Sequence, residues 1–287
     1  MTKCIILTPT YNDWSSLKRL ISEIGKKSET LNYSLNILIV NDASSIKKDL
    51  KGLKKGKIQK IEIVNLKKNV GSQIAIAVGL NLINKKKEPM DILILDSDGE
   101  DNPEKINLLL KTLNSNKKKI VVASRSKRRE NVILKVLNFL RLSVTFLITG
   151  KLIDFGNYSC FNKKLLRKII KKRELNLSYS GTIQKYLQIK KVSIDKNLRY
   201  QGESKVSLSF LFLYSLKIIS IFKYESLIRS IFFIITIFLV FTFIDIKINY
   251  FFIILLLFIL NICLFIINSQ ARQGNLLDLI EKIKLIK

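Results

Sequence analysis

The chain has 287 residues, carries 50 Lys and Arg against 22 Asp and Glu for a formal net charge of +28, and contains no histidine. This length accommodates one large domain, or one domain with an appendage, at about 100–200 residues per domain. An apolar share of 48% argues against intrinsic disorder, three isolated cysteines exclude a disulfide framework or a zinc cluster, and the lack of histidine excludes Ser-His and Cys-His catalysis.

The N-terminal half alternates short apolar runs rich in Ile and Val with helix-like stretches. We expect strands at residues 4–8, 35–40, 58–64, 91–95 and 119–124. The helices expected between them span residues 14–27, 71–84 and 103–113, the last with Asn102 as its N-cap. Strands alternating with helices predict an α/β fold with a doubly wound, mostly parallel sheet, which binds ligands beyond the carboxyl ends of its strands.

Polar segments follow four of these strands, namely PTYND, NDAS, NVGSQIA and DSDGEDNPE. In the last of them, Asp96 and Asp98 stand one residue apart on a turn. Two such carboxylates can hold a divalent cation and a nucleotide ribose, and hard oxygen ligands suit Mg²⁺ or Mn²⁺. The layout predicts a nucleotide site at this edge of the sheet, although an Asp-x-Asp pair alone also occurs in ordinary loops.

Two further segments have the composition of apolar helices. Residues 207–227 are apolar on most helical faces, with Lys217 and Lys223 spaced along them, which is typical of a helix lying at a membrane surface. Residues 132–152 form a shorter and more interrupted apolar stretch. Either segment could instead pack in the core of the N-terminal domain.

The sequence becomes strongly apolar from Ile228 onward. Two apolar runs, 228–244 and 251–267, contain a single charged residue, Arg229, at one end. Each run matches the lower limit of about 17 residues for a helix that crosses a bilayer. The short segment 245–249 allows only a tight hairpin, so we expect two transmembrane helices whose outer ends lie on the same side. Buried core helices fit poorly, because both runs are apolar on all faces.

Basic residues near the hairpin predict its orientation. Lys217, Lys223, Arg229 and Arg272 flank its outer ends, whereas Lys247 stands alone in the turn. Because basic residues favour the cytoplasmic side, the N-terminal domain and the C-terminal tail should face the cytoplasm at the inner membrane. The first residues lack a long apolar region and a small-residue cleavage site, so no secretory signal is expected.

Five blocks occur in the order TPTYND, VNDAS, NVGSQIAIAVGL, DSDGEDNPE and RYQGESK. Together they resemble the motifs of family 2 glycosyltransferases with the GT-A fold, and more closely those of the polyprenyl-phosphate sugar transferases related to dolichyl-phosphate mannose synthase. The resemblance covers residues 1–208, and the following hairpin is similar to that of the bacterial members. It implies a GT-A domain at residues 1–208, an interfacial juxtamembrane helix at 209–226, two transmembrane helices within 227–267 and a cytoplasmic tail at 268–287.

Carried over residue by residue, the resemblance implies a nucleotide pocket. Pro9, Tyr11 and Asn12 would line the base and ribose, Asp42 would hydrogen-bond the base, and Asp96 would face the nucleotide. Tyr11 and Asn12 could also form an ordinary turn that caps the first helix.

The same resemblance implies a divalent cation, Mg²⁺ or Mn²⁺, as the cofactor. Asp98 would be its chief ligand and would bridge to the diphosphate, with Asp96 beside it. Relatives usually have Gln where this chain has Glu100, so Glu100 is either an additional metal ligand or a surface substitution. The block DFGNYSCF, with Asp154 and Asn157, stands where the family has another motif, and a role for it in sugar binding is a hypothesis.

The acceptor can be argued from chemistry. Transfer to a sugar hydroxyl needs a carboxylate general base, because the alcohol loses its proton as it attacks. In relatives of that kind an acidic residue opens a helix in the second half of the domain, whereas residues 175–191 contain no Asp or Glu. A lipid phosphate is already anionic, so the missing base favours a phosphate acceptor. The Gln-x-x-Arg-Trp signature of processive members is absent, and Trp14 is the only tryptophan.

A phosphate acceptor needs cations, and two basic segments supply them. The residues expected to bind the acceptor phosphate are Arg125, Arg128, Arg199, Ser204 and Lys205. Guanidinium groups pair phosphate oxygens bidentately, and Arg125 and Arg199 are expected to act in catalysis together with Asp98. The alternative is that these residues belong to solvated basic loops.

We therefore expect an inverting, metal-dependent enzyme that moves a sugar from a nucleotide sugar, UDP-linked rather than GDP-linked, to polyprenyl (undecaprenyl) phosphate at the cytoplasmic face of the inner membrane. One alternative is a family 2 transferase that acts on a glycan or lipid-linked oligosaccharide hydroxyl. Another is a non-catalytic membrane scaffold that keeps the nucleotide-binding fold. A nucleic-acid partner, which the net charge would allow, is not expected, and a homo-oligomer formed through the membrane helices is left open.

Overall fold

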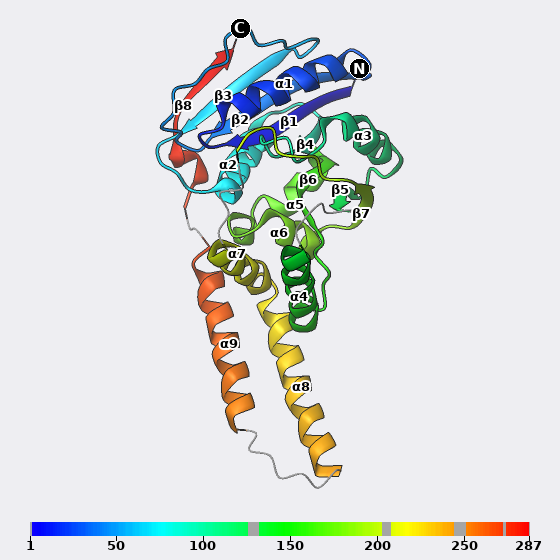
Figure 1. The fold of residues 1–287 in the computed structure, drawn as a ribbon, viewed down its shortest axis with the longest axis vertical. Coiled ribbons are helices and arrows are strands. Elements are labelled where there is room, and N and C mark those ends of the chain that lie inside the picture. Colours follow the sequence, from blue (N-terminus) through cyan, green and yellow to red (C-terminus); the bar gives the residue numbers. More distant parts are fainter. Residues whose placement is uncertain (1, 126–131, 203–207, 244–250, 272–273, 287) are drawn as a thin grey trace. The chain divides into compact units, whose positions relative to one another are not determined.

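The computed structural model describes residues 2–125, 132–202, 208–243, 251–271 and 274–286. The chain divides into two units by its internal contacts. The first unit comprises residues 1–129, 154–205 and 273–287, and the second comprises residues 130–153 and 206–272. The first unit contains a β-sheet with its covering helices, and the second contains apolar helices (Figure 1).

An eight-stranded sheet forms the first unit, in the order β7-β5-β6-β4-β1-β2-β3-β8. Its strands are β1 (Thr2–Thr10), β2 (Tyr33–Asn41), β3 (Lys60–Leu66), β4 (Asp91–Ile94), β5 (Ile120–Arg125), β6 (Phe155–Asn162), β7 (Ile189–Ile194) and β8 (Ile280–Ile286). β6 and β8 run antiparallel to the strands beside them, and the remaining pairings are parallel. The predicted mostly parallel α/β sheet is confirmed, with β6, β7 and β8 in addition to the five expected strands.

Helices cover both faces of this sheet. They are α1 (Trp14–Ser28), α2 (Ser72–Lys85), α3 (Ile106–Ser115), α5 (Lys163–Ile169) and α6 (Tyr179–Tyr186), with short 3-10 turns η1 (Pro103–Lys105), η2 (Arg173–Asn176) and η3 (Leu276–Leu279). On one face, α1 and α3 bury their apolar sides against the sheet in the main core. On the other face, α2 packs on β1 and β2, and α5 and α6 pack beside it. The side chain of Asn102 accepts the Glu104 amide at 2.9 Å, which confirms the expected N-cap before α3.

The C-terminal segment adds a strand to the edge of the sheet. β8 pairs antiparallel with β3, and in Figure 1 it lies beside β3 at the sheet edge. η3, which precedes β8, buries Leu276 and Leu279 and contacts α2. The Lys67 amide donates to the Leu279 carbonyl at 2.9 Å. The segment expected as a tail at 268–287 therefore includes a folded part of the sheet unit, which its lysine-rich sequence did not predict.

The second unit is built from α4 (Val132–Thr149), α7 (Leu208–Ser220), α8 (Lys223–Phe243) and α9 (Phe251–Ser269). α8 and α9 are both long and apolar enough to cross a membrane, and most of their residues are exposed. α4 packs on α7 and α8, so it groups with these helices and not with the sheet core. The interfacial helix expected over 207–227 ends earlier, at Ser220, because the buried pair Ile221 and Phe222 turns the chain into α8.

Polar side chains join α8 to α9 inside this unit. The Asn261 amide donates to Ser230 Oγ at 2.9 Å, and Ser226 Oγ donates to Asn261 Oδ1 at 3.3 Å. All three side chains are buried. Nearby, the Arg229 guanidinium donates to the Leu147 carbonyl at the end of α4, at 3.4 Å. Hydrogen bonds between apolar helices are a common means of fixing helix pairs in a lipid environment.

Two leucines of the C-terminal segment test whether it is docked on the sheet. Leu279 is buried and Leu285 is 54% exposed. We expect Leu279→Ala to reduce the free energy of unfolding by about 2–5 kcal/mol, whereas Leu285→Ala should change it by about 0.5 kcal/mol or less. Thermal unfolding of the full chain measures both. Equal shifts for the two variants would contradict the docked strand.

Candidate functional site

Three loops converge at one edge of the sheet because their strands are parallel. β1, β2 and β4 are hydrogen-bonded neighbours, and each ends at this edge. The loop after β1 carries Tyr11, Asn12 and Asp13, the loop after β2 carries Asp42, and the loop after β4 carries the acidic segment 96–101. The polar strand ends identified in the sequence thus lie at the same edge of the fold.

The loop after β4, residues 96–101, holds closely spaced carboxylates. Its turn depends on Gly99, whose φ of +85° is strained for any other residue. Burial raises the pKa of Asp98 to about 6, and repulsion from Asp96 and Glu100 adds to the increase. The side chains of Asp98 and Glu100 remain partly accessible, at 16% and 25% exposure. The loop is therefore an electronegative site that favours a bound cation.

Cationic side chains from residues 195–201 neutralise this loop. Arg199 lies 3.4 Å from Asp98 and 3.6 Å from Asp13, and Lys196 lies 2.5 Å from Glu100. The backbone is paired as well, since the Tyr200 amide donates to the Asp98 carbonyl and the Asn197 amide donates to the Glu100 carbonyl, both at 2.9 Å. Arg199 thus links the loop after β1 with the loop after β4.

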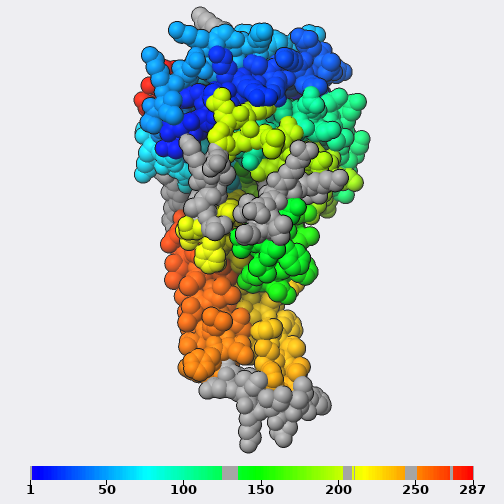
Figure 2. Space-filling model, viewed as in Figure 1, coloured from blue at the N-terminus to red at the C-terminus, as the bar shows by residue number. Residues whose placement is uncertain are grey.

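Tyr200 anchors the same segment to α1 and to the turn of the acidic loop. Its hydroxyl donates to Glu23 at 2.6 Å, and the Arg19 guanidinium stacks 4.4 Å above its ring. A Cβ atom at Gly99 would lie 2.4 Å from the Tyr200 ring. The 195–201 segment, yellow-green in Figure 2 beside the blue of α1, therefore packs directly against the acidic turn.

The three carboxylates expected as metal ligands, Asp96, Asp98 and Glu100, lie on the same loop. In the described part of the chain, no three His, Cys, Asp or Glu side chains converge as a ligand cluster. Asp96, Asp98 and Glu100 share one loop and repel each other, while Arg199 and Lys196 balance their charge. Hard carboxylate oxygens are the ligand type that suits Mg²⁺ or Mn²⁺, and a role for these three residues as metal ligands remains a prediction.

The residues expected to line the nucleotide make contacts within the chain. Both oxygens of Asp42 accept backbone amides, from Val70 and from Gly71, each at 2.8 Å. Burial raises the pKa of Asp42, and these two amides oppose the increase. Asn12 has a φ of 52°, and its side chain accepts the Ile46 amide at 3.0 Å. Asp42 and Asn12 thus fix the loops at this edge of the sheet, and their contacts with a base remain a prediction.

The other expected residues differ in how far they can be placed. Pro9 is buried within β1, and Tyr11 is 46% exposed beyond its end. Arg125 is the last residue of β5, and its side chain is outside the described part of the structure. Arg128, Ser204 and Lys205 lie outside the described residues. Of the residues expected to bind the acceptor phosphate, Arg199 is therefore the one whose side chain the structure describes.

Asp96 has partners that its sequence motif did not indicate. Its Oδ1 accepts the Asn157 amide at 3.0 Å, and its backbone amide donates to Asp101 at 2.9 Å. The side-chain oxygen of Asn157, Oδ1, accepts a hydrogen bond from the Gln73 side-chain N–H at 3.3 Å. Gln73 belongs to the NVGSQIA block, and its place after a predicted strand is the sequence feature that could have marked it as a site residue. Its partner on β6, Asn157, could not be predicted from the sequence spacing.

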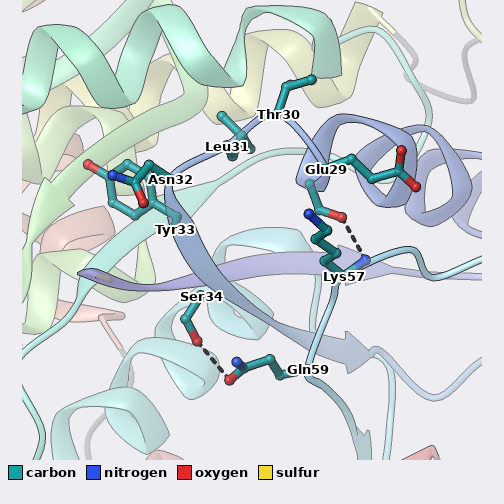
Figure 3. Close-up of a pocket in the computed structure, with 9 residues that line it drawn as sticks. Glu29, Thr30, Leu31, Asn32, Tyr33, Ser34, Lys57 and Gln59 are labelled. Atoms are coloured by element: carbon teal, nitrogen blue, oxygen red, sulfur yellow. Dashed lines mark hydrogen bonds between the residues drawn. The ribbon is translucent and has the colours of Figure 1, made fainter.

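The described part of the chain contains a cavity of about 950 Å³ lined by α1, by residues 102–104 directly after the acidic loop and by residues 195–200. Another, of about 330 Å³, is lined by residues around Ser34, Lys57 and Gln59, with Ser34 donating to Gln59 at 2.7 Å (Figure 3). Ser34 and Gln59 lie at the amino ends of β2 and β3, so the smaller pocket is at the edge opposite the acidic loop.

A mostly parallel sheet of this order, with an acidic loop after its central strand, defines a GT-A-like glycosyltransferase domain. The chain belongs to glycosyl transferase family 2, since the model of that family matches residues 5–173. Nucleotide-sugar transfer is therefore its class of reaction.

Relatives and solved structures agree with this family. The uncharacterised glycosyltransferase YkcC of Bacillus subtilis (strain 168) is 23% identical over 231 residues, covering 77% of this chain and 69% of the relative. The uncharacterised glycosyltransferase sll0501 of Synechocystis sp. is 25% identical over 210 residues, covering 70% of this chain and 63% of the relative. The chain thus spans about two thirds of the length of these relatives.

The fold is similar to that of glucosyl-3-phosphoglycerate synthase from Mycobacterium tuberculosis, solved in complex with Mn²⁺, UDP-glucose and phosphoglyceric acid. The TM-score is 0.52 at 13% identity, with 78% of this chain and 79% of that chain covered. At this identity the similarity concerns the fold.

Substitution of Gly99 tests the packing of residues 195–201 on the acidic turn. Gly99→Ala introduces a Cβ atom into the Tyr200 ring, so we expect faster tryptic cleavage after Lys196 and Arg199, measured by mass spectrometry. Gly52→Ala is the matched control, because Gly52 also has a positive φ, of +66°, but a Cβ atom there meets nothing within 4 Å. The same cleavage rate in both variants would contradict the packing.

Proposed function

We propose that this family 2 glycosyltransferase transfers a sugar, with inversion, from a UDP-linked donor to polyprenyl phosphate at the cytoplasmic face of a membrane. The observation that carries this proposal is the start of α6. Residues 175–191 contain no Asp or Glu, and α6 opens with Ser178 as its N-cap. A hydroxyl acceptor would need a carboxylate base, whereas a phosphate acceptor does not.

Two carboxylates outside this segment, Glu174 and Asp154, have partners within the domain. Glu174 accepts the Tyr186 hydroxyl at 2.9 Å, and Asp154 is paired with Lys191 at 2.6 Å. These contacts hold both carboxylates within the domain instead of leaving them to take a proton from an acceptor. They support an acceptor that arrives already ionised.

The donor would bind at the acidic loop. Asp98, with Asp96 and Glu100 beside it, would hold a divalent cation, which when bound neutralises the diphosphate as it leaves. Support comes from the glucosyl-3-phosphoglycerate synthase structure, in which a related fold is solved with Mn²⁺ and UDP-glucose. UDP is accordingly the first donor nucleotide to test.

The acceptor phosphate would bind to cations at the same edge of the sheet. Arg199 lies within 4 Å of two carboxylates, Asp13 and Asp98, which supports a role for its guanidinium beside the donor diphosphate. Arg125, Arg128, Ser204 and Lys205 would complete the phosphate site. An oxygen of the lipid phosphate attacks the anomeric carbon, the bond from that carbon to the UDP oxygen breaks, and UDP leaves with the electron pair. No proton moves at the acceptor oxygen.

The membrane is the surface on which a lipid acceptor would be presented. α8 and α9 would cross it, and α7 and α4 would lie at its surface, since large apolar side chains on all four helices are exposed. Lys217, Lys223 and Arg229 near the start of α8 support a cytoplasmic orientation. A polyprenyl phosphate could then react without leaving the bilayer.

A donor panel tests the reaction. Membranes that contain the protein, supplied with labelled UDP- or GDP-sugars, Mg²⁺ and undecaprenyl phosphate, should form a labelled lipid that organic solvent extracts. Asp98→Asn should lower this activity about 100-fold or more, because it removes charge at the leaving diphosphate. Asp49→Asn, in an exposed loop, is the matched control and should retain activity. No product with any donor would favour a non-catalytic scaffold.

The acceptor itself provides a second test. Undecaprenyl phosphate should be used, whereas undecaprenol, which carries a neutral hydroxyl, should give no product above background, because residues 175–191 offer no Asp or Glu to take its proton. Extraction and chromatography of the labelled lipid measure both. Product formed with an oligosaccharide or with undecaprenol would overturn the phosphate acceptor and favour a hydroxyl-using transferase.

A further inference from the structure

A row of hydrogen bonds connects Asp96 to the start of α6. Asn157 on β6 donates its side-chain N–H to Asp96 Oδ1 at 3.0 Å. Gln73 near the start of α2 donates to Asn157 Oδ1 at 3.3 Å. The backbone amide of Tyr179, the first residue of α6, donates to Gln73 Oε1 at 2.7 Å. Segments that are far apart in the sequence thus meet through two amide side chains.

The ends of this row fix its direction. The backbone N–H of Tyr179 can only donate, so Gln73 must present its oxygen to it and its NH₂ group to Asn157. Asn157 must then present its oxygen to Gln73 and its NH₂ group to the carboxylate of Asp96. Because hydrogen bonds in such a row polarise one another, the bond that reaches the charged carboxylate is strengthened.

Residues of β6 contact both ends of this row of hydrogen bonds, Asp96 and Tyr179. Asn157 and Ser159 are two residues apart, so their side chains lie on the same face of the strand. Ser159 Oγ hydrogen-bonds the hydroxyl of Tyr179 at 2.7 Å, and this tyrosine is fully buried. The start of α6 is therefore fixed to the same strand that fixes Asp96.

We propose that Asn157 and Gln73 are positioning residues for glycosyl transfer. They hold the Asp96 carboxylate at a set distance from the start of α6, and so determine where the donor sugar lies between them. The inference rests on the proposed function in one respect, that Asp96 contacts the bound nucleotide and cation. Neither amide takes part in bond making or breaking.

A second Asn–Asp pair on the same two strands provides a control. Asn162 donates to Asp91 at 3.3 Å, and these two residues are partners in the antiparallel register of β6 and β4. This pair lies at the opposite end of β4 from Asp96. Asn162 has the same side chain as Asn157 but lies away from the acidic loop. Substitution of Asn162 therefore measures the effect on UDP binding of losing an Asn–Asp hydrogen bond between β6 and β4 outside the site.

The experiment measures UDP binding in the presence of Mn²⁺ by calorimetry, and thermal unfolding, on the full chain. Asn157→Ala should weaken UDP binding about tenfold, and Asn157→Asp should weaken it further, because a carboxylate then faces Asp96. Gln73→Glu should also weaken binding, because it keeps the acceptor for the Tyr179 amide but loses the donor to Asn157. Asn162→Ala should lower the unfolding temperature and leave the affinity for UDP within about twofold.

The outcomes separate the two proposals. If the wild-type chain binds UDP with Mn²⁺ and Asn157→Ala binds it equally well, the positioning role is overturned and the proposed function stands. If Asn157→Ala and Asn162→Ala weaken binding equally, the amides are merely structural and the positioning role is again overturned. A wild-type chain that binds no UDP with Mn²⁺ would overturn the proposed donor and the inference with it.

Discussion

Repulsion among closely spaced carboxylates is the constraint around which the site is built. Asp96, Asp98 and Glu100 occupy alternate positions of one loop, where burial raises the pKa of Asp98 to about 6 and repulsion from Asp96 and Glu100 adds to the increase. A folded chain keeps such a loop only if other groups offset the charge. Here Arg199 and Lys196 approach from a distant part of the chain, and Asn157 donates to Asp96. The packing of Tyr200 on Gly99 and its bond to Glu23 keep those cations in place.

Under the proposed function, the same charges would couple the binding of the donor to the binding of the acceptor. A divalent cation and Arg199 have charge of the same sign, so they compete for Asp98. Under the proposed function, a cation bound at Asp98 weakens the pair with Arg199 and leaves the guanidinium for a phosphate. Donor binding would then prepare the acceptor site. The separate ion pair of Lys196 with Glu100 also connects the 195–201 segment to the acidic loop.

The sequence predicted the parts of the fold that have a local signal. β1 to β5 are apolar runs of Ile and Val, and parallel pairing brings their polar ends to one edge. β6 was missed because the aromatic residues of FGNYSCFN recur at every third position instead of every second, and β8 was missed because lysines in IEKIKLI suggest a solvated tail. In the site, the Asp-x-Asp loop was predictable from its position after a strand. The pairing of Asp98 with Arg199, and of Asp96 with Asn157, depends on chain crossings that no local pattern encodes.

The return of the C-terminal strand constrains the path of the chain through any bilayer. Residues 206–272 form one excursion between two segments of the same sheet unit, because β8 pairs with β3 after the apolar helices end. An excursion that starts and ends in one folded unit must cross a bilayer an even number of times. Two helices satisfy this condition, and a single crossing does not. If the apolar helices enter a membrane as proposed, strand pairing thus excludes a single crossing independently of the distribution of basic residues.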